Sequence, residues 1–399
     1  MIMKKILVIT PKFPIPTTGA CEQERLAGIL QLQRLGWEVR IVARAFNWQD
    51  KNEINQWSKD SGIAVDLVDY EFIKNKNWRA KIKRIMQPKY WDGAAYEYGL
   101  PAMQSAVARL VEEFQPDIAW FDYTYLWPLY KIFQKKKIPI VTRSINFEPT
   151  HFLQEDGISF LNILKFLPKF LSELKVIGQS DYLFAITPKE EQLYRKLGAK
   201  NIATLPLRSL PLLLADKREI VDKKVLHLFF MGASYNVHHS RKAAEFIIKK
   251  IAPAVTRKAP GKFIFHLVGK KLPSDLARLC VGNIKVEGFI ENLAEFLNKI
   301  DIALVPSLMG AGMQQKIFEP LCLGIPTVTS PRGLVGYSFQ DEEHLLLAKT
   351  KGEFVEQILR LQDGELKKKL SRRAMRQSRE LFSQNKLNEI IQHGLNNIL

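Results

Sequence analysis

The stretch "IALVPSLMGAGMQQKIFEPLCLGIPTVTSPRGLVG", residues 302–336, decides the fold. It begins with a short apolar run, passes through the glycine-containing loop 310–312, and then reads as a helix from about Gln314 that ends at Gly324. A second apolar run, 327–330, follows directly. A strand, a glycine-containing turn, a helix and another buried strand form the repeating unit of a doubly wound α/β sheet.

Apolar runs of strand length recur along the chain, separated by segments long enough for crossover helices. Most are apolar at every position, as expected of strands that are buried on both faces of a parallel sheet. The predicted strands are Ile6–Thr10, Val39–Ala43, Val65–Tyr70, Asp117–Tyr123, Ile138–Ser144, Tyr182–Thr187, Leu226–Met231, Phe263–Val268, Ile284–Gly288, Ile302–Pro306 and Thr327–Ser330. The sequence therefore predicts an α/β protein with two doubly wound halves.

The length of 399 residues also favours two domains, because single cores stop growing at about 250–300 residues. A boundary is expected near residue 208, where the Pro-containing stretch "LPLRSLPLLLADKREIVDKK" passes into a charged run. After residue 353 only helices are expected. The predicted divisions are an N-terminal domain 1–207, a C-terminal domain 208–375 and a last helix, 376–399, that packs back on the N-terminal domain.

Cysteine content and the N-terminus indicate a reducing compartment, and we expect a cytoplasmic protein. The three cysteines lie far apart without a CxxC pair, so neither a disulfide framework nor a zinc cluster is predicted. The apolar run near the start is too short for a secretory signal and reads as a first strand. No run of about 18 apolar residues is present, so no membrane span is expected.

The charge points to anionic partners. Lys and Arg number 59 against 41 Asp and Glu, giving a formal net charge of +18. Such a field favours nucleic acid, anionic lipid headgroups or phosphorylated substrates, and charge alone does not choose among them.

Two strand-to-helix turns carry candidate binding residues. In the loop and helix after the strand 302–306, the amides of the glycine loop and Lys316 are suited to phosphates. Glu319 lies three residues from Lys316, on the same helix face, and is suited to the hydroxyls of a ribose. The alternative is an exposed Lys–Glu pair on an amphipathic helix. The first turn of the chain offers Gly19 before a helix, a weaker signal.

This stretch resembles the nucleotide-sugar site of retaining, GT-B-fold glycosyltransferases of family 4. Four further blocks resemble that family in the same order: 5–43, 229–255, 265–273 and 284–307. The resemblance implies two Rossmann-like domains facing across a cleft, with C-terminal helices crossing back. It also implies sugar transfer from a nucleotide-diphosphate donor to an acceptor hydroxyl with retention and no obligatory metal, in surface polysaccharide, lipopolysaccharide or glycan assembly. A UDP-sugar is the first expectation for the donor and a GDP-sugar the second.

The resemblance also implies roles for individual residues. Lys316, Glu319 and His151 would act in catalysis, and Asn146 and Glu148 would bind the acceptor. The residues implied for donor binding are Gly19, Gly232, Arg241, Gly310, Gly312, Lys316, Glu319, Thr329 and Gly333.

The chain departs from the family pattern in three places. Ile145 stands where an active-site His normally follows the strand, and His151 is the candidate substitute. Ala311 occupies the position of the first Glu of a Glu pair, as in other members with a Gly-Ala-Gly loop. The usual Arg and Lys after the first strand of the second half are also not clearly in place, and Arg241 and Lys242 are their candidate replacements.

The acceptor side carries basic segments with aromatic residues, 74–91 and 160–175. Rings and cations together suit an anionic lipid surface, which favours a lipid-linked glycan acceptor at the inner face of the cell membrane. The alternative is core helices with solvated basic edges.

Two other functional classes stay open. A sugar-nucleotide epimerase would use the same ribose grip without an acceptor, and a non-enzymatic protein would only bind an anionic ligand. Nucleic acid is not an expected partner, because no RNA- or DNA-binding motif is recognisable.

Overall fold

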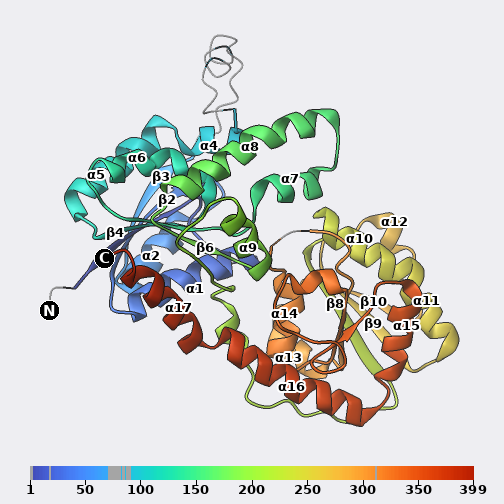
Figure 1. Ribbon diagram of the computed structural model, residues 1–399. Coiled ribbons are helices and arrows are strands. Elements are labelled where there is room, and N and C mark those ends of the chain that lie inside the picture. The colour runs from blue at the N-terminus through green and yellow to red at the C-terminus, as the bar shows by residue number, and fades with distance from the viewer. Residues whose placement is uncertain (1–2, 18, 71–81, 83–85, 87–90, 311) are drawn as a thin grey trace. The chain divides into compact units, whose positions relative to one another are not determined.

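The computed structural model describes residues 3–17, 19–70, 82, 86, 91–310 and 312–399, and its elements are labelled in Figure 1. The chain forms two compact units. The first unit extends to Ser209 and also contains Leu387–Leu399, and the second unit is Leu210–Lys386.

The first unit is built on a seven-stranded sheet in which every printed pairing is parallel. Its strands are β1 Lys5–Thr10, β2 Glu38–Ala45, β3 Ala64–Asp69, β4 Ile118–Phe121, β5 Ile140–Arg143, β6 Tyr182–Ala185 and β7 Ile202–Thr204. They lie in the order β3-β2-β1-β4-β5-β6-β7. Ile6 and Val8 enter one hydrophobic cluster while Leu7 and Ile9 enter another. Both faces of β1 are therefore buried, which is why its sequence is apolar throughout.

Helices cover both faces of this sheet. They are α1 Ala20–Arg34, α2 Lys51–Ser61, α4 Gly93–Tyr98, α5 Pro101–Phe114, the short η2 Thr124–Leu129, α6 Tyr130–Gln134, α7 Glu148–Asp156, α8 Phe160–Gln179 and α9 Pro188–Lys196. Several begin at a side-chain cap, since Asp50, Ser159 and Thr187 each accept a hydrogen bond from a first-turn amide.

The C-terminal helix α17, Gln384–Asn396, also belongs to the first unit from Leu387 onward. Three apolar side chains of α17 are buried in the same cluster as β1: Leu387, Ile391 and Leu395. Asn388 accepts a hydrogen bond of 2.8 Å from Gln31 of α1. A Cβ atom on Gly394 would lie 2.5 Å from the ring of Phe184, so glycine allows the helix to approach β6.

The second unit has a six-stranded parallel sheet in the order β10-β9-β8-β11-β12-β13. Its strands are β8 Leu226–Ser234, β9 Phe263–Lys270, β10 Ile284–Gly288, β11 Ile302–Val305, β12 Thr327–Thr329 and β13 Leu346–Leu347. Its helical segments are η3 Leu210–Leu213, α10 His238–Phe246, η4 Ile247–Ile251, α11 Ala252–Lys258, α12 Ser274–Ala277, α13 Leu293–Lys299, α14 Gln315–Cys322, η5 Pro331–Leu334, α15 Lys351–Arg360 and α16 Gly364–Phe382.

The expectation of two doubly wound halves is confirmed, and all the predicted strands are present, β10 with the predicted ends and the others with at least one end shifted. Sequence patterns missed β7 and β13, which span three and two residues and are too short to form an apolar run. None of the described helices is long and apolar enough to cross a membrane. Most of the basic segment 74–91 lies outside the described residues.

Candidate functional site

The loop between β11 and α14 depends on its glycines. Gly310 and Gly312 have φ angles of 101° and 65°, in the left-handed region that L side chains rarely adopt. A Cβ atom on Gly310 would also lie 2.8 Å from the side-chain amide of Gln314. The loop therefore brings its backbone close to the start of α14, where Gln314 provides no side-chain cap for the first-turn amides. These amides can donate hydrogen bonds to a bound anion.

Glu319 lies one turn into α14 with its side chain buried, only 4% exposed. Its carboxylate has one hydrogen bond in the described part of the chain, a long contact of 3.5 Å from Gln315. Burial raises the pKa of Glu319, and the bond from Gln315 opposes this only in part. A buried carboxylate with so few donors gains from any ligand that brings hydroxyl groups.

Lys316 precedes Glu319 by three residues, a spacing that places both side chains on one helix face. The Lys316 ammonium lies 5.3 Å from the centre of the Phe230 ring on β8. Because β8 and β11 are neighbours in the sheet, this contact directs the cation toward the carboxyl ends of the central strands.

The turn after β12 closes on the same loop. Arg332 of η5 donates a hydrogen bond of 2.8 Å to the carbonyl of Gly310. A Cβ atom on Gly333 would lie 2.5 Å from Ile317 of α14 and 3.0 Å from the Ser307 side chain. The Ser307 hydroxyl is buried without a hydrogen-bond partner among the described residues. By contrast, Thr329 donates to the carbonyl of Val305 at 2.8 Å, so its hydroxyl is used inside the sheet.

The region after β8 contributes differently from the sequence-based expectation. Gly232 is buried, and a Cβ atom there would lie 3.1 Å from both Tyr235 and Ser240. Arg241 donates to the carbonyl of Tyr235 at 3.4 Å and lines a cavity of about 210 Å³ between α10 and α12. The α10 residue beside the glycine loop is His239, 3.7 Å from where a Cβ of Gly310 would stand. His239 could not be predicted from the sequence, because the adjacent histidines in "VHHSRK" carry no spacing signal.

In the first unit, Glu148 has the best-defined surroundings among the predicted acceptor residues. It opens α7, is buried, and accepts hydrogen bonds from Tyr123, at 2.6 Å, and from Tyr125. His151 lies three residues further along α7, and its Nδ1 atom is buried without a partner among the described residues. The half-buried Asn146 precedes the helix, and its carbonyl accepts a hydrogen bond of 3.0 Å from Ser144.

Gly19 lies at the N-cap of α1 in the first unit. A Cβ atom on Gly19 would lie 2.6 Å from a carboxylate oxygen of Glu22, which forms an ion pair with Lys12. The backbone at Gly19 is extended, with φ −135°, and the flexible Glu22 side chain could move aside, so the structure does not require glycine here.

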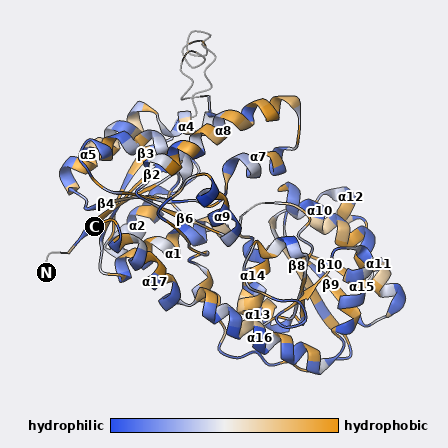
Figure 2. Ribbon diagram, in the orientation of Figure 1, coloured by the Kyte–Doolittle hydropathy of each residue, from blue (hydrophilic) through white to orange (hydrophobic). Residues whose placement is uncertain are grey.

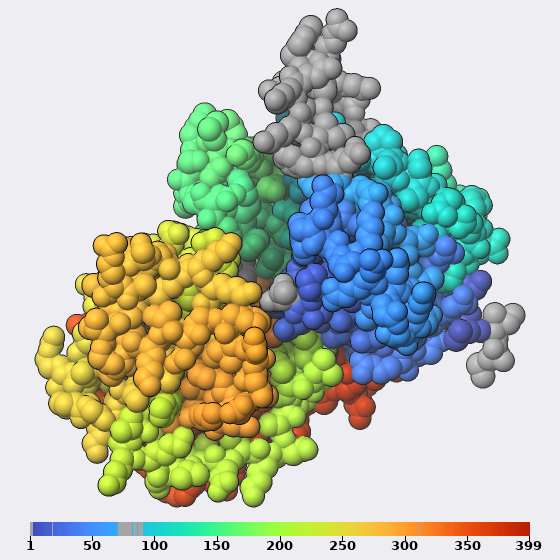
Figure 3. Space-filling model, turned by 180° about the vertical axis from the view of Figure 1, so that it is seen from behind, coloured from blue at the N-terminus to red at the C-terminus, as the bar shows by residue number. Residues whose placement is uncertain are grey.

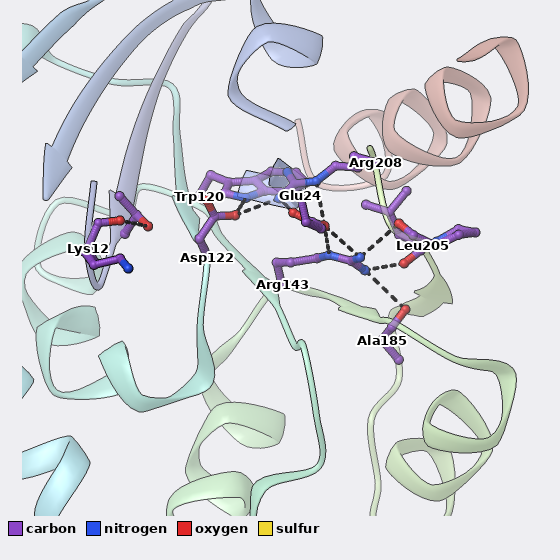
Figure 4. A network of polar contacts seen from close by, with 10 residues as sticks. Lys12, Glu24, Trp120, Asp122, Arg143, Ala185, Leu205 and Arg208 are labelled. Atoms are coloured by element: carbon purple, nitrogen blue, oxygen red, sulfur yellow. Dashed lines mark hydrogen bonds and ion pairs between the residues drawn. The ribbon is translucent and has the colours of Figure 1, made fainter. Parts of the chain in front are cut away.

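A buried ionic network lies near the carboxyl edge of the first sheet, and Figure 4 shows its side chains. Glu24 of α1 accepts hydrogen bonds from Arg143, at the end of β5, and from Arg208. Arg208 also donates to Asp122 at 3.2 Å. The two guanidinium groups hold the pKa of Glu24 at about 2, even though burial alone would raise it. The network could not be predicted from the sequence, because its members are single residues that lie far apart along the chain.

Two more carboxyl groups of the first unit are buried and form no ion pair among the described residues. Burial raises the pKa of Glu173 on α8 to about 8 and that of Glu190 on α9 to about 7. Their hydrogen bonds come from Tyr194 and Thr124 for Glu173, and from the amide of Phe147 and the hydroxyl of Thr187 for Glu190. No group of three or more acidic, His or Cys side chains in the described residues could hold a metal ion.

Comparison with known proteins agrees with this picture. Residues 226–363 match the family model described as Glycosyl transferases group 1. No curated protein matches the sequence. Among solved structures, the sucrose-phosphate synthase of Thermosynechococcus elongatus superposes with a TM-score of 0.69 at 14% identity, covering 99% of both chains.

Two ligand-bound structures have the same architecture. Anabaena HepE in complex with UDP and glucose gives a TM-score of 0.66 at 12% identity, covering 98% of this chain and 99% of the other. A mutant of S. aureus TarM in complex with Fondaparinux, alpha-GlcNAc-glycerol and UDP gives 0.67 at 11% identity, covering 99% of both. These likenesses establish that the chain has the GT-B fold.

Proposed function

We propose that this protein is a retaining glycosyltransferase of family 4 that uses a nucleotide-diphosphate sugar as donor. The observation that carries the proposal is the buried, sparsely bonded Glu319 beside a glycine loop and an uncapped helix start. The match of residues 226–363 to the model described as Glycosyl transferases group 1 supports the glycosyltransferase part of this proposal.

The site residues fit the parts of such a donor. Glu319 would accept hydrogen bonds from the ribose hydroxyls, and these bonds would lower the free-energy cost of burying its carboxylate. The amides around Gly310 and Gly312, with Lys316, would bind the diphosphate. As the bond from the anomeric carbon to the diphosphate breaks, the same groups would stabilise the developing negative charge. The acceptor oxygen takes the place of the diphosphate, and its proton passes to the departing group.

The remaining predicted donor residues fall into two groups. Gly333 supports the proposal because its missing side chain allows η5 to approach Ser307 and α14. Gly232, Thr329, Gly19 and Arg241 would act indirectly, by allowing or fixing the surrounding loops. A UDP-sugar is the preferred donor, because the HepE and TarM structures hold UDP, and a GDP-sugar is the second choice.

On the acceptor side, Glu148, Asn146 and His151 gather at the start of α7. His151 would take the place of the missing active-site His at Ile145, because its Nδ1 atom is buried and has no partner in the described residues. Glu148 would orient the acceptor through the hydroxyls of Tyr123 and Tyr125 that it fixes.

A lipid-linked glycan acceptor is proposed from the surface of α8. Figure 2 shows that α8 is rich in hydrophobic residues, drawn in orange. Its exposed large apolar side chains are Phe160, Leu161, Ile163, Leu164, Leu167, Leu171 and Leu174. In Figure 3 the green residues of α7 and α8 stand out beside the blue and cyan body of the same unit. Single exposed apolar residues need no explanation, but a contiguous row does.

The occupant we propose for this row is an anionic lipid bilayer. Phe160 is 76% exposed and Leu161 66%, in a chain with a net charge of +18. Apolar side chains that enter the headgroup region, together with attraction between cations and lipid phosphates, give peripheral binding. The protein would then work at the inner face of the cell membrane, in surface polysaccharide, lipopolysaccharide or glycan assembly.

The experiment that tests the transferase function is incubation of the protein with UDP-glucose, UDP-N-acetylglucosamine and GDP-mannose, with and without a lipid extract as acceptor. Mass spectrometry follows the nucleotide and the lipid. Release of nucleoside diphosphate that depends on the lipid, with a mass increase of one sugar, is expected. Conversion of the free donor into an isomer without acceptor would instead identify an epimerase.

A further inference from the structure

Arg25 on α1 and Arg44 in β2 are buried cations that form no close ion pair with a described carboxylate. They are 6% and 4% exposed. Arg25 Nε and one terminal nitrogen of Arg44 are buried with no hydrogen-bond partner among the described residues, and neither side chain is in a described ion pair. The buried Arg143 and Arg208 differ in this respect, because both form ion pairs with the carboxylate of Glu24.

Tyrosine rings surround both guanidinium groups. The Cζ atom of Arg44 lies 4.2 Å from the ring centre of Tyr98 and 5.1 Å from that of Tyr70. The Cζ atom of Arg25 lies 5.7 Å from the ring centre of Tyr123. Stacking on a ring engages the face of a guanidinium group and leaves its N–H groups, which point outward in its plane, for another ligand.

Tyr98 connects the two cations. Both arginine charges act to lower the pKa of Tyr98, although burial raises that pKa overall. Tyr98 also stacks on Tyr125, with ring centres 6.5 Å apart. The two arginines and these tyrosines are therefore one cluster, which we call the Arg–Tyr cluster: Arg25, Arg44, Tyr70, Tyr98, Tyr123 and Tyr125.

The Arg–Tyr cluster occupies the edge of the sheet where ligands of such folds bind. Tyr70 directly follows β3, Tyr123 follows β4 by two residues, and Arg44 is the last residue but one of β2. Parallel α/β sheets bind ligands at the carboxyl ends of their strands. The hydrogen bond of 2.6 Å from Tyr123 to Glu148 joins the cluster to the proposed acceptor residues.

The nearby carboxylates are engaged elsewhere. Glu97 accepts from the Tyr70 hydroxyl at 3.1 Å, and Glu148 accepts from Tyr123 and Tyr125. Asp122 accepts from Trp120 and Arg208 through Oδ1. Burial acts to lower the pKa of Arg25, but the neighbouring Cys21 and Asp122 outweigh it and raise that pKa. Burial lowers the pKa of Arg44, as expected of a cation without a close counter-charge. An uncompensated buried charge destabilises a fold, and binding sites commonly retain such a cost.

We propose that Arg25 and Arg44 bind a phosphate group of the acceptor, with the tyrosine rings holding the two guanidinium groups in place. This inference rests on the proposed transferase function and adds the chemical class of its acceptor. Guanidinium groups suit the task because their fixed N–H forks match phosphate oxygens. The phosphate comes either from a lipid headgroup or from a soluble sugar phosphate.

Isothermal titration of the full chain tests the proposal, with the donor site first saturated with UDP and the ionic strength held constant. Glucose 6-phosphate is the soluble probe, and neutral glucose and glucuronate are its comparisons. We expect saturable binding of the phosphate and a Kd weakened about tenfold or more in Arg25→Met and in Arg44→Met, the loss expected for one charge-assisted contact. Arg34→Met, at the exposed end of the same helix, should bind as the wild type does.

A second arm replaces the sugar phosphate with vesicles of phosphatidylcholine, with or without phosphatidic acid. Retention that needs phosphatidic acid and is weakened in both variants identifies a lipid phosphate, and binding of glucose 6-phosphate alone identifies a soluble one. Either result supports the proposal. Equal binding by the wild type and both variants overturns the proposal. It is also overturned if the wild type binds neither glucose 6-phosphate nor phosphatidic acid, or if it binds glucuronate more tightly than glucose 6-phosphate.

Unfolding in urea separates a binding role from a structural one. Each Arg→Met change keeps the apolar stem. Arg44→Met also removes a buried charge without a close counter-charge and should be at least as stable as the wild type, and Arg25→Met should unfold at nearly the same urea concentration as the wild type. A marked loss of stability would assign the arginines to the fold and overturn the proposal. UDP binding is scored separately: if UDP binds and phosphate does not, the transferase proposal stands while this inference fails. If UDP fails to bind, the transferase proposal fails and the phosphate titration is repeated in Lys316→Ala. Phosphate binding that persists in Lys316→Ala and is weakened in Arg25→Met and Arg44→Met supports the phosphate site, and binding that is lost in Lys316→Ala overturns it.

Discussion

Glu24 and Arg208 lie 184 positions apart in the sequence and are joined by two hydrogen bonds of 2.6 and 3.0 Å in the core of the first unit. Arg208 stands next to the last residue of the first part of that unit, Ser209. The chain therefore leaves the first unit directly after a residue that is fixed to α1. Arg143 adds a third member, so a single carboxylate satisfies two buried cations.

Glu24→Gln should destabilise the protein by about 3–5 kcal/mol, because it leaves buried Arg143 without its ion-pair partner and Arg208 with Asp122 alone. Urea unfolding followed by circular dichroism measures this change. Glu295→Gln is the matched control, since Glu295 forms an exposed ion pair with Lys299 on α13 and should have little effect. Equal stability of the two variants would contradict the structural role of the network.

The same network predicts a loss of stability in acid. The pKa of Glu24 is about 2 in the folded protein, below its ordinary value of 4.5. A depressed carboxyl pKa contributes stability that is present above the ordinary value and is lost as pH falls toward 2. This part of the acid sensitivity should be absent in Glu24→Gln. An identical decline in both proteins between pH 4.5 and 2 would exclude Glu24 as its origin.

Glu173 and Glu190 predict a loss of stability at the opposite end of the pH scale. Their pKa values of about 8 and 7 lie above the ordinary 4.5, so the folded state holds protons that the unfolded chain releases. Their contribution is complete below pH 4.5 and declines as pH rises to 8, by at most about 1.4 kcal/mol per pH unit for each group. Glu173→Gln should flatten this decline in thermal melts. A slope that is unchanged in the variant would show that Glu173 does not titrate there.

Gly310→Ala should weaken UDP binding, because residue 310 needs a φ of 101° and has no room beside Gln314. The strain is on the order of 1–3 kcal/mol, enough to displace the loop. Gly261→Ala is the control, since Gly261 also has a positive φ, 70°, but open space around it. Gly261→Ala should lower the melting temperature and leave the Kd for UDP unchanged. If Gly310→Ala and Gly261→Ala bind UDP with the same Kd, the loop is not part of the donor site.

The exposed row on α8 predicts binding to vesicles. Leu164→Asp and Leu167→Asp should each reduce co-sedimentation with vesicles containing phosphatidylglycerol, because a carboxylate is repelled by the lipid and no longer buries apolar surface. Leu279→Asp, an exposed leucine of the second unit, is the control. Binding that is unaffected by all three substitutions, or absent in the wild type, would exclude α8 as a membrane contact.

The sequence was informative wherever function and fold depend on neighbouring positions. The buried strands are predictable because both faces of each sheet are covered, which leaves continuous apolar runs such as Ile6–Thr10. Gly310, Lys316 and Glu319 could be predicted as one candidate site because a loop and one turn of helix place them within ten positions. Short strands such as Leu346–Leu347 could not be found, since two residues form no pattern.

Contacts between distant parts of the chain stayed hidden. Glu24, Arg143 and Arg208 meet only because the carboxyl ends of parallel strands share one edge of a sheet. Arg25 and Arg44 appear in the sequence as ordinary basic residues, and only their burial against Tyr98 distinguishes them from the many solvated cations. The position of His239 beside Gly310 likewise depends on how α10 packs on the loop.

The central claim is that Glu319 binds the ribose of a nucleotide donor, and the most direct measurement is the UDP-induced shift in melting temperature of wild type, Glu319→Ala and Glu319→Gln. A ligand that binds only the native state raises the midpoint. We predict a clear shift with UDP in the wild type and its loss in Glu319→Ala, with Glu319→Gln intermediate because an amide oxygen still accepts. Equal shifts in all three proteins, or none in the wild type with any nucleoside diphosphate, would contradict the claim.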